Sequence, residues 1–279
     1  MVGNSFSFIL NTLKMKQIIY AALLMFITAC STVPLTNRRQ FTAIPSSQML
    51  SLSNESYKTV LETEKISNNN QATQNIRVVG NRITKAVEEY LRSIDRLSLI
   101  DGYKWEYNLL ESKTMNAWCM PGGKIVFYEG ILPICKNDNG IAVVMAHEIA
   151  HAIANHGNER MSQQMVVEMG GVALTEALRN EKEQTTQLAL LAFGVGTQVG
   201  VILPYSRKHE SEADEMGLYF MAMAGYDPRE APLLWERMQQ SGSGGTPEFL
   251  STHPNPQSRI NELNKIMPKA IEYYNQHNK

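Results

Sequence analysis

Apolar and polar positions follow two different periods along the chain. In residues 46–66 and 71–94, apolar side chains recur at three- and four-residue spacing, which predicts two amphipathic scaffold helices. Between residues 104 and 128 the spacing falls to two, and Pro121-Gly122-Gly123 interrupts the run, which predicts a strand hairpin. We therefore expect an α+β fold that is mostly helical, with a small antiparallel sheet.

One segment, residues 141–154, is almost wholly apolar apart from two histidines and a glutamate. Residues 137–140 before it and 155–157 after it have the composition of a helix start and a helix end. A helix this apolar is buried, and buried imidazole and carboxylate groups need a partner. A bound metal ion is such a partner.

The three polar residues, His147, Glu148 and His151, have the spacing of a catalytic zinc site. Residues four apart lie on one face of an α-helix, so His147 and His151 can bind one ion. Glu148 borders the same face and can act as the general base toward a zinc-activated water. The alternative is a surface helix with two histidines, which the apolar flanks disfavour. The sequence predicts one Zn²⁺ per chain.

The third ligand must come from another segment. The metzincin pattern is excluded, because Ala154 and Gly157 stand where that pattern has glycine and a third histidine. Glu210 and Asp214 share one face of a second predicted helix, residues 206–224. Glu210 can complete the ligand set, while Asp214 accepts the free ring N–H of a liganding histidine. The alternative is a solvated acidic face.

Four separated motifs carry a family resemblance. They are Asn-Ala-Trp-Cys-Met-Pro-Gly-Gly at 116–123, His-Glu-Ile-Ala-His at 147–151, Glu-Ser-Glu-Ala-Asp at 210–214, and Thr-His-Pro at 252–254 with Arg259. Together they resemble the zinc endopeptidase family that includes HtpX and the CAAX prenyl proteases, in layout its soluble, lipoprotein-anchored periplasmic branch. The resemblance implies a gluzincin-type zinc metallopeptidase domain, which we expect over residues 46–279.

The resemblance also implies roles for residues outside the two helices. Asn116 and Ala117 would lie on an edge strand that pairs with the extended backbone of a substrate. The alternative for them is a plain antiparallel sheet. His253 would either donate to the oxyanion in the transition state, or occupy the fourth zinc position and hold the enzyme latent. The alternative for His253 is a histidine that caps a Pro-rich turn.

The N-terminus has the layout of a bacterial lipoprotein signal. An apolar run over residues 18–29 follows two lysines and ends in Ile-Thr-Ala-Cys at Cys30. We expect residues 1–29 to be a signal peptide, Cys30 to be lipidated, and residues 30–45 to be a polar tether to the membrane. The alternative is an ordinary secretory signal with Cys30 incidental. By resemblance, the residue after the cysteine favours the outer membrane, on the periplasmic side of the bacterial cell envelope.

A second apolar stretch, residues 188–203, contains Gln198 and is short for a membrane span. We expect it to be part of a helical insertion over the cleft that contacts the membrane or a second subunit.

Composition narrows the choice of function. Because 26 Lys and Arg are balanced by 27 Asp and Glu, there is no basic surplus and we expect no nucleic-acid partner. We expect a zinc-dependent endopeptidase that hydrolyses peptide bonds of misfolded or stalled envelope proteins. The alternative is a chaperone-like assembly factor for outer-membrane proteins, which holds unfolded chains in the same groove without obligatory cleavage.

Overall fold

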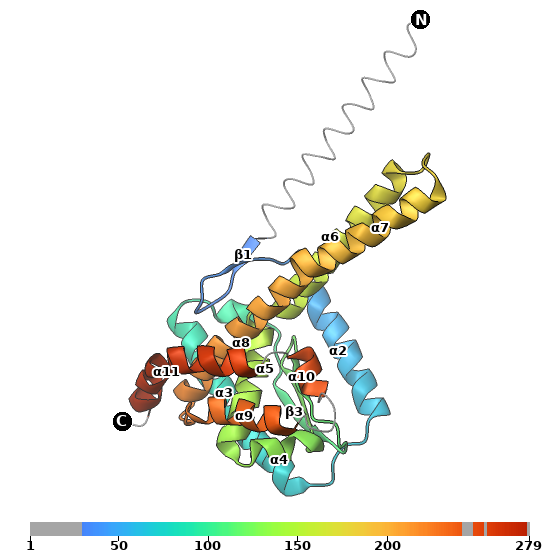
Figure 1. Ribbon diagram of the computed structural model, residues 1–279. Coiled ribbons are helices and arrows are strands. Elements are labelled where there is room, and N and C mark those ends of the chain that lie inside the picture. Colours follow the sequence, from blue (N-terminus) through green and yellow to red (C-terminus); the bar gives the residue numbers. More distant parts are fainter. Residues whose placement is uncertain (1–29, 242–247, 254–255, 278–279) are drawn as a thin grey trace, which may run out of the picture.

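The structure, a computed structural model, describes residues 30–241, 248–253 and 256–277, and it is mostly helical with a small sheet, as expected (Figure 1). The signal peptide expected over residues 1–29 lies outside the described residues. The strands are β1 (Cys30–Thr32), β2 (Arg39–Phe41), β3 (Glu106–Leu110), β4 (Ala117–Met120) and β5 (Lys124–Tyr128). The α-helices are α2 (Ser46–Thr63), α3 (Asn70–Ser93), α4 (Leu132–Cys135), α5 (Asp138–Ile153), α6 (His156–Ala177), α7 (Glu183–Thr197), α8 (Leu203–Met223), α9 (Glu230–Ser241), α10 (Glu248–Thr252) and α11 (Pro256–His277).

A three-stranded sheet in the order β3-β5-β4 supports the core. β4 pairs antiparallel with β5, as the hairpin pattern predicted, and β3 joins β5 in parallel. The hairpin turns at Gly122 and Gly123, whose φ values of +89° and +79° favour glycine. Alternate side chains face opposite sides: Ile125 enters the main core beneath α3 and α5, whereas Val126 packs with Tyr57 of α2. The sheet is therefore covered by helices on both faces.

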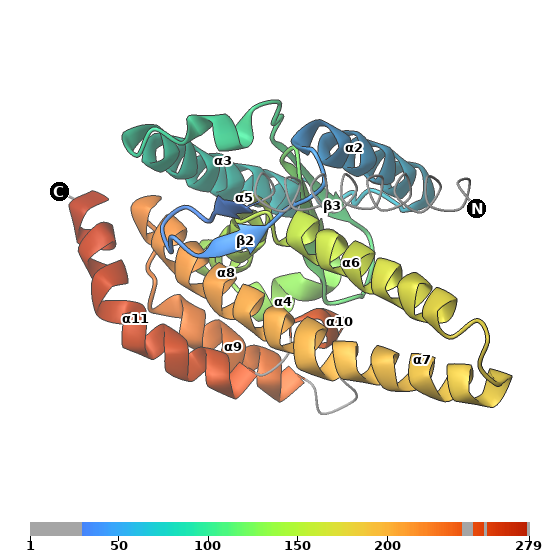
Figure 2. The same cartoon turned by 90° about the horizontal axis from the view of Figure 1, so that it is seen from above.

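Helix α5 is the buried centre of the molecule. Figure 2 shows it between α3 on one side and α8, α9 and α11 on the other, and its residues 140–150 are all buried. Asn137 begins the helix, because its side chain accepts a hydrogen bond from Gly140 N at 3.1 Å. The apolar run predicted over residues 141–154 is confirmed as this buried helix.

Residues 30–45 pack against the domain instead of extending as a free tether. β1 and β2 form an antiparallel hairpin, and Val33 between them is fully buried. Farther on, Asn158 Nδ2 of α6 donates to Ile44 O at 2.7 Å. The polar composition suggested a solvated linker, but its polar groups find partners on α6. Cys30 opens β1, and its lipidation stays a prediction.

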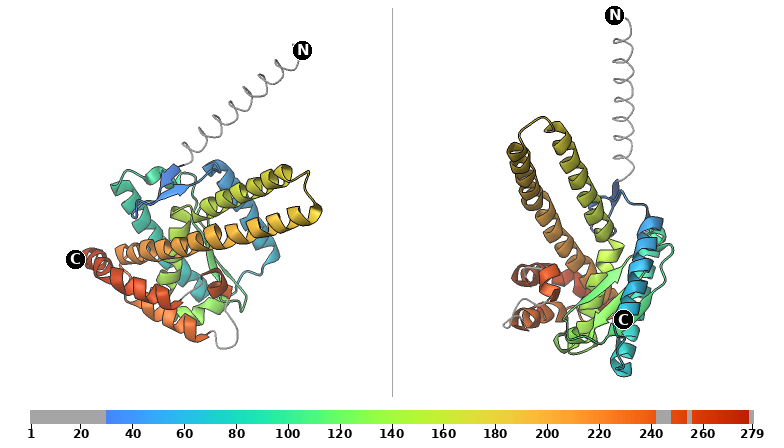
Figure 3. Two further views of the ribbon diagram at one scale, coloured as in Figure 1. Left: turned by 45° about the horizontal axis from the view of Figure 1, so that its top comes forward. Right: turned by 90° about the vertical axis from the view of Figure 1, so that its right-hand side faces the viewer.

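Helices α6 and α7 form a hairpin that projects from the rest of the fold (Figures 1 and 3). α7 continues through a π-helical turn, Gln198–Ile202, directly into α8. A helix start at residue 206 is therefore wrong, because the apolar residues before it continue the helix. By its length and composition, the combined stretch Glu183–Met223 is long and apolar enough to cross a membrane. Core helices of soluble proteins can have the same length and composition. Its contacts with a membrane or a second subunit stay a prediction.

Candidate metal centre

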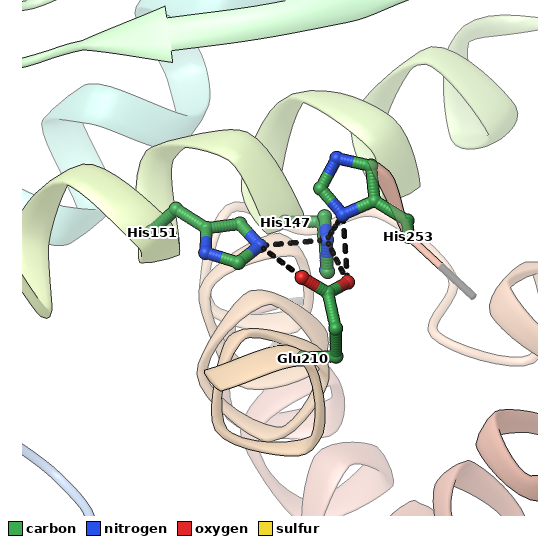
Figure 4. A group of neighbouring side chains, drawn as sticks. All are labelled: His147, His151, Glu210 and His253. Carbon is green, nitrogen blue, oxygen red and sulfur yellow. Dashed lines mark hydrogen bonds and ion pairs between the residues drawn. The ribbon is translucent and has the colours of Figure 1, made fainter. Parts of the chain in front are cut away.

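Four side chains meet where α5 and α8 cross (Figure 4). The ligand atoms of His147, His151, Glu210 and His253 all lie within 4.8 Å of one another. His147 Nε2 is 3.1 Å from His151 Nε2 and 3.5 Å from Glu210 Oε2, and His151 Nε2 is 3.4 Å from Glu210 Oε1. Zinc bonds of about 2.1 Å in a tetrahedral site separate the ligand atoms by roughly 3.4 Å. The spacing of the four groups fits one ion.

The chemistry of these groups also fits zinc. Among the residues that the structure describes, the buried oxygens Glu148 Oε1 and Glu210 Oε1 have no hydrogen-bond partner, and a buried carboxylate oxygen needs a donor or a cation. Burial lowers the pKa of His151 well below its usual value, so its ring is neutral and can offer a lone pair. Burial opposes ionisation of Glu210, but the neighbouring histidines, His151 foremost, hold its pKa below the usual range. A neutral imidazole and an ionised carboxylate are what zinc binds.

Asp214 and Arg259 orient His147. Asp214 Oδ1 is 3.1 Å from His147 Nδ1, which leaves Nε2 directed at the other ligand atoms. Arg259 Nε donates to Asp214 Oδ2 at 2.7 Å, and its guanidinium lies 3.5 Å from the centroid of the Trp235 ring. Burial opposes ionisation of Asp214, but the charge of Arg259 lowers the pKa of this carboxyl. The carboxylate is therefore ionised and can accept a hydrogen bond from the Nδ1–H group of His147.

Glu148 faces a cleft beside the ligand cluster. The cleft has a volume of about 200 Å³, and its lining includes Glu148, His151 and His253 together with Cys119 of β4 and Arg160 of α6. Burial raises the pKa of the Glu148 carboxyl, which makes it a stronger base. A base on the wall of a cleft can act on a molecule that enters it.

His253 follows α10 and reaches the cluster from the opposite side to His151 (Figure 4). Its Nδ1 is 2.6 Å from Glu210 Oε2 and 3.2 Å from His147 Nε2. Phe249 of α10 stacks on Trp235 with ring centroids 5.7 Å apart, and this contact places the short helix. His253 therefore stands as a fourth group around the same point.

β4 is an edge strand of the described sheet and lies against α5. Ala117 N donates to Asn116 Oδ1 at 2.9 Å, and Asn116 O accepts from Tyr128 N at 3.1 Å. Phe249 N donates to Met115 O at 3.1 Å, so α10 adjoins the chain that leads into this strand. The contact of Asn116 and Ala117 with a substrate stays a prediction.

The sequence patterns did not predict that a further histidine, His156, is buried next to the cluster. A histidine just after a helix usually serves as a cation that favours the helix dipole. Instead His156 is 1% exposed, and burial lowers its pKa to about 4, so it is neutral. Its Nδ1 lies 2.8 Å from His151 Nδ1, and its Nε2 lies 3.0 Å from Glu212 Oε2. No local spacing signals this, because Glu212 is 56 positions away.

The two buried helices bring together the side chains of two histidines and a glutamate. A second glutamate beside them can act as a base, and this arrangement defines a metallopeptidase. The sequence matches peptidase family M48 over residues 80–267, and the chain belongs to this family. It is 33% identical over 264 residues to the mitochondrial metalloendopeptidase OMA1 of Schizosaccharomyces pombe, covering 92% of this chain and 74% of the relative. The Saccharomyces cerevisiae enzyme of that name is 35% identical, with 91% and 73% covered. The protein is a metalloendopeptidase with zinc as its cofactor.

A bacterial relative matches less of the chain. The beta-barrel assembly-enhancing protease of Escherichia coli is 29% identical over 181 residues, which covers 60% of this chain and 36% of that protein. The relatives that cover nine tenths of the chain are mitochondrial by name, so the expected location in the bacterial outer membrane is wrong. A short pattern before one cysteine holds too little information to fix a cellular compartment.

Proposed function

We propose that His147, His151 and Glu210 bind the zinc ion and that Glu148 is the general base in peptide hydrolysis. The observation that supports this most strongly is the meeting of the three ligand side chains, from two helices, within 4.8 Å of one another. Glu148 follows the first ligand and lines the adjoining cleft. The base and the ligand His151 therefore line the same cleft, in which a peptide would lie.

The chain's own residues supply the proton transfers. When bound, zinc acts as a Lewis acid toward water and the scissile carbonyl. Glu148 takes a proton from the attacking water and delivers it to the leaving amine nitrogen, which requires a base close to the cleft. Asp214 keeps the ring proton of His147 on Nδ1, and Arg259 keeps Asp214 in place.

We assign His253 to the fourth ligand position, where it holds the enzyme latent. Its Nδ1 lies 2.6 Å from Glu210 Oε2, beside the other ligand atoms, and catalysis needs that position open. His253 Nε2 is also 3.4 Å from Glu148 Oε1, so the ring covers the general base as well. Activity then requires α10 to move the histidine away.

Misfolded or unassembled proteins are the substrate class that we propose. β4 is an edge strand beside the cleft, and backbone pairing with such a strand does not depend on side-chain identity. A folded protein hides its backbone, whereas an unfolded chain offers it. The bacterial relative whose name refers to beta-barrel assembly supports a role in protein quality control.

A substitution of the general base tests the proposal. The full-length chain and its Glu148→Gln variant are incubated with an unfolded, fluorescently labelled protein. We expect Glu148→Gln to keep one zinc per chain and to lose about 100- to 10,000-fold in cleavage rate. Glu168→Gln, an exposed glutamate of α6 outside the site, is the matched control and should cleave normally. Cleavage by Glu148→Gln at the wild-type rate would contradict the assignment.

The same experiment separates cleavage from holding. If wild type and Glu148→Gln bind the unfolded protein equally and neither cuts it, the chaperone-like alternative is correct and the peptidase role fails.

Membrane attachment through Cys30 is a separate part of the proposal. Its support is the apolar run over residues 18–29 that leads to this cysteine. Acylation would add a lipid mass to the peptide that begins at Cys30, and Cys30→Ser would remove it. An unmodified cysteine in the membrane-free fraction would contradict the attachment.

A further inference from the structure

A second group of buried polar side chains lies behind His151. Arg38 comes from the turn between β1 and β2, His156 and Glu159 come from α6, and Glu212 comes from α8. The Arg38 side chain is 10% exposed, and the other three are buried still more deeply. The group therefore joins the N-terminal hairpin to the two helices that flank the metal centre.

One hydrogen-bonded path leads from this group to the ligand cluster. Because His151 Nε2 faces Glu210 and His147, its Nδ1 carries the ring proton and can donate to His156 Nδ1 at 2.8 Å. His156 then carries its own proton on Nε2 and donates to Glu212 Oε2 at 3.0 Å. Each proton position follows from the one before it. The path thus fixes the orientation of both rings.

Arg38 closes the path at its outer end. Its Nε donates to Glu212 Oε2 at 2.7 Å, and its Nη2 donates to Glu159 Oε2 at 2.7 Å. His209 Nε2 lies 2.8 Å from Glu159 Oε2. The His209 ring stacks on the His156 ring, with centroids 4.3 Å apart. Arg38 already supplies the cation that both carboxylates require, so this group is not a second metal site. Loss of the guanidinium would leave two buried carboxylates without it.

We propose that His156 is a positioning residue for the ligand His151, and that Arg38 holds it there through Glu212. Docking of the N-terminal hairpin thereby controls how tightly the chain retains zinc. This inference rests on the proposed function, since it takes His151 as a zinc ligand. Residues 30–45 thus help to position a zinc ligand, although they lie far from the metal centre in sequence.

Zinc affinity measured against a competing chelator tests the inference on the full-length chain. Removing a hydrogen-bond partner of a metal ligand typically costs about 10- to 100-fold in affinity. We expect His156→Phe to raise the Kd for zinc by about that factor, and His156→Asn, whose side-chain oxygen can accept from His151 Nδ1, to recover most of the loss. Arg38→Met should raise the Kd by roughly 10-fold. Arg39→Met, the same charge change at the next, exposed position, should leave it unchanged.

The visible spectrum of the cobalt-substituted protein gives a readout that a general loss of stability does not move. Freeing the His151 ring should change the cobalt bands in His156→Phe and Arg38→Met, and leave them unchanged in Arg39→Met. Should His156→Phe fail to fold, Arg38→Met and His156→Asn decide the question. Wild-type affinity and spectrum in Arg38→Met and the His156 variants would overturn this inference alone. A wild-type chain that binds no zinc would overturn the proposed function instead.

Discussion

Gly217 of α8 lies against the backbone of His147 in α5: a Cβ at Gly217 would stand 2.9 Å from His147 N and 3.0 Å from His147 Cα. Glu210, Asp214 and Gly217 recur at positions four and three apart, so they share one face of α8. The closest approach of the two helices therefore sets the distance between His147 and both carboxylates. A methyl group added at this point would push the two helices apart and increase the distance between the ligands.

Gly217→Ala tests this coupling. We expect a loss of about 1–3 kcal/mol in the free energy of unfolding, because the backbone of α5 cannot yield, together with weaker zinc binding. Chemical denaturation and zinc analysis measure the two effects. Gly194→Ala, in α7 where a Cβ meets nothing within 4 Å, is the control and should be neutral or stabilising by up to about 1 kcal/mol. Equal stability of both variants would show that the crossing tolerates a methyl group.

Zinc content should distinguish the ligands from the residue that orients them. We expect His151→Ala and Glu210→Ala to lose zinc on dialysis, because each removes one of the three ligands that remain when His253 moves away. Asp214→Asn should still bind zinc, with a Kd raised about 10- to 100-fold. Elemental analysis of the dialysed proteins measures this. One zinc per chain in dialysed Glu210→Ala would place the third ligand elsewhere.

His253→Ala should increase peptidase activity. If the histidine blocks about nine molecules in ten, its removal raises the rate about tenfold, since the competent fraction rises by that factor. Initial rates on an unfolded substrate, at equal zinc loading, provide the measurement. A large fall in rate would instead assign His253 to the oxyanion.

Acid should weaken the fold through Glu159. Burial opposes ionisation of this carboxyl, but hydrogen bonds from His209 and Arg38 lower its pKa from 4.5 to about 2. The unfolded chain then binds more protons between these values. The stabilisation is complete above the unfolded pKa and is lost as the pH falls from about 5 to about 2, with a slope of up to about 1.4 kcal/mol per pH unit.

Arg38→Met should make that slope shallower, and Arg39→Met should not. Urea unfolding between pH 2.5 and 6 compares the two variants with the wild type. Parallel curves for wild type and Arg38→Met would show that Arg38 does not set the pKa of Glu159.

Local patterns were sufficient to predict the elements that carry the site. The four-residue spacing of His147 and His151 and the capping side chain of Asn137 are properties of one helix, so α5 could be predicted from sequence alone. The turn at Gly122 and Gly123 is likewise local. The position of Glu210 opposite His147 follows from helix periodicity once the two helices are assumed to meet.

Contacts between distant segments could not be predicted in this way. Arg38 and Glu212 are 174 positions apart, and no periodicity relates the polar N-terminal hairpin to α8. The parallel pairing of β3 with β5 depends on the order of strands in the sheet, which an alternating pattern leaves undetermined. The unbroken join of α7 to α8 was missed because Pro204 and Ser206 look like a helix start, although the helix runs through Pro204 directly after the π-helical turn.

That join connects the projecting arm to the metal centre. Glu183–Met223 is one helical stretch of 41 residues, in which Glu210 is buried. The α7 end of this stretch projects from the rest of the fold (Figure 3). The helix therefore links the projecting arm to Glu210, and its hydrogen-bond pattern changes to that of a π-helix at Gln198–Ile202. A single helical stretch thus runs from the periphery of the molecule to the residue proposed as the third zinc ligand.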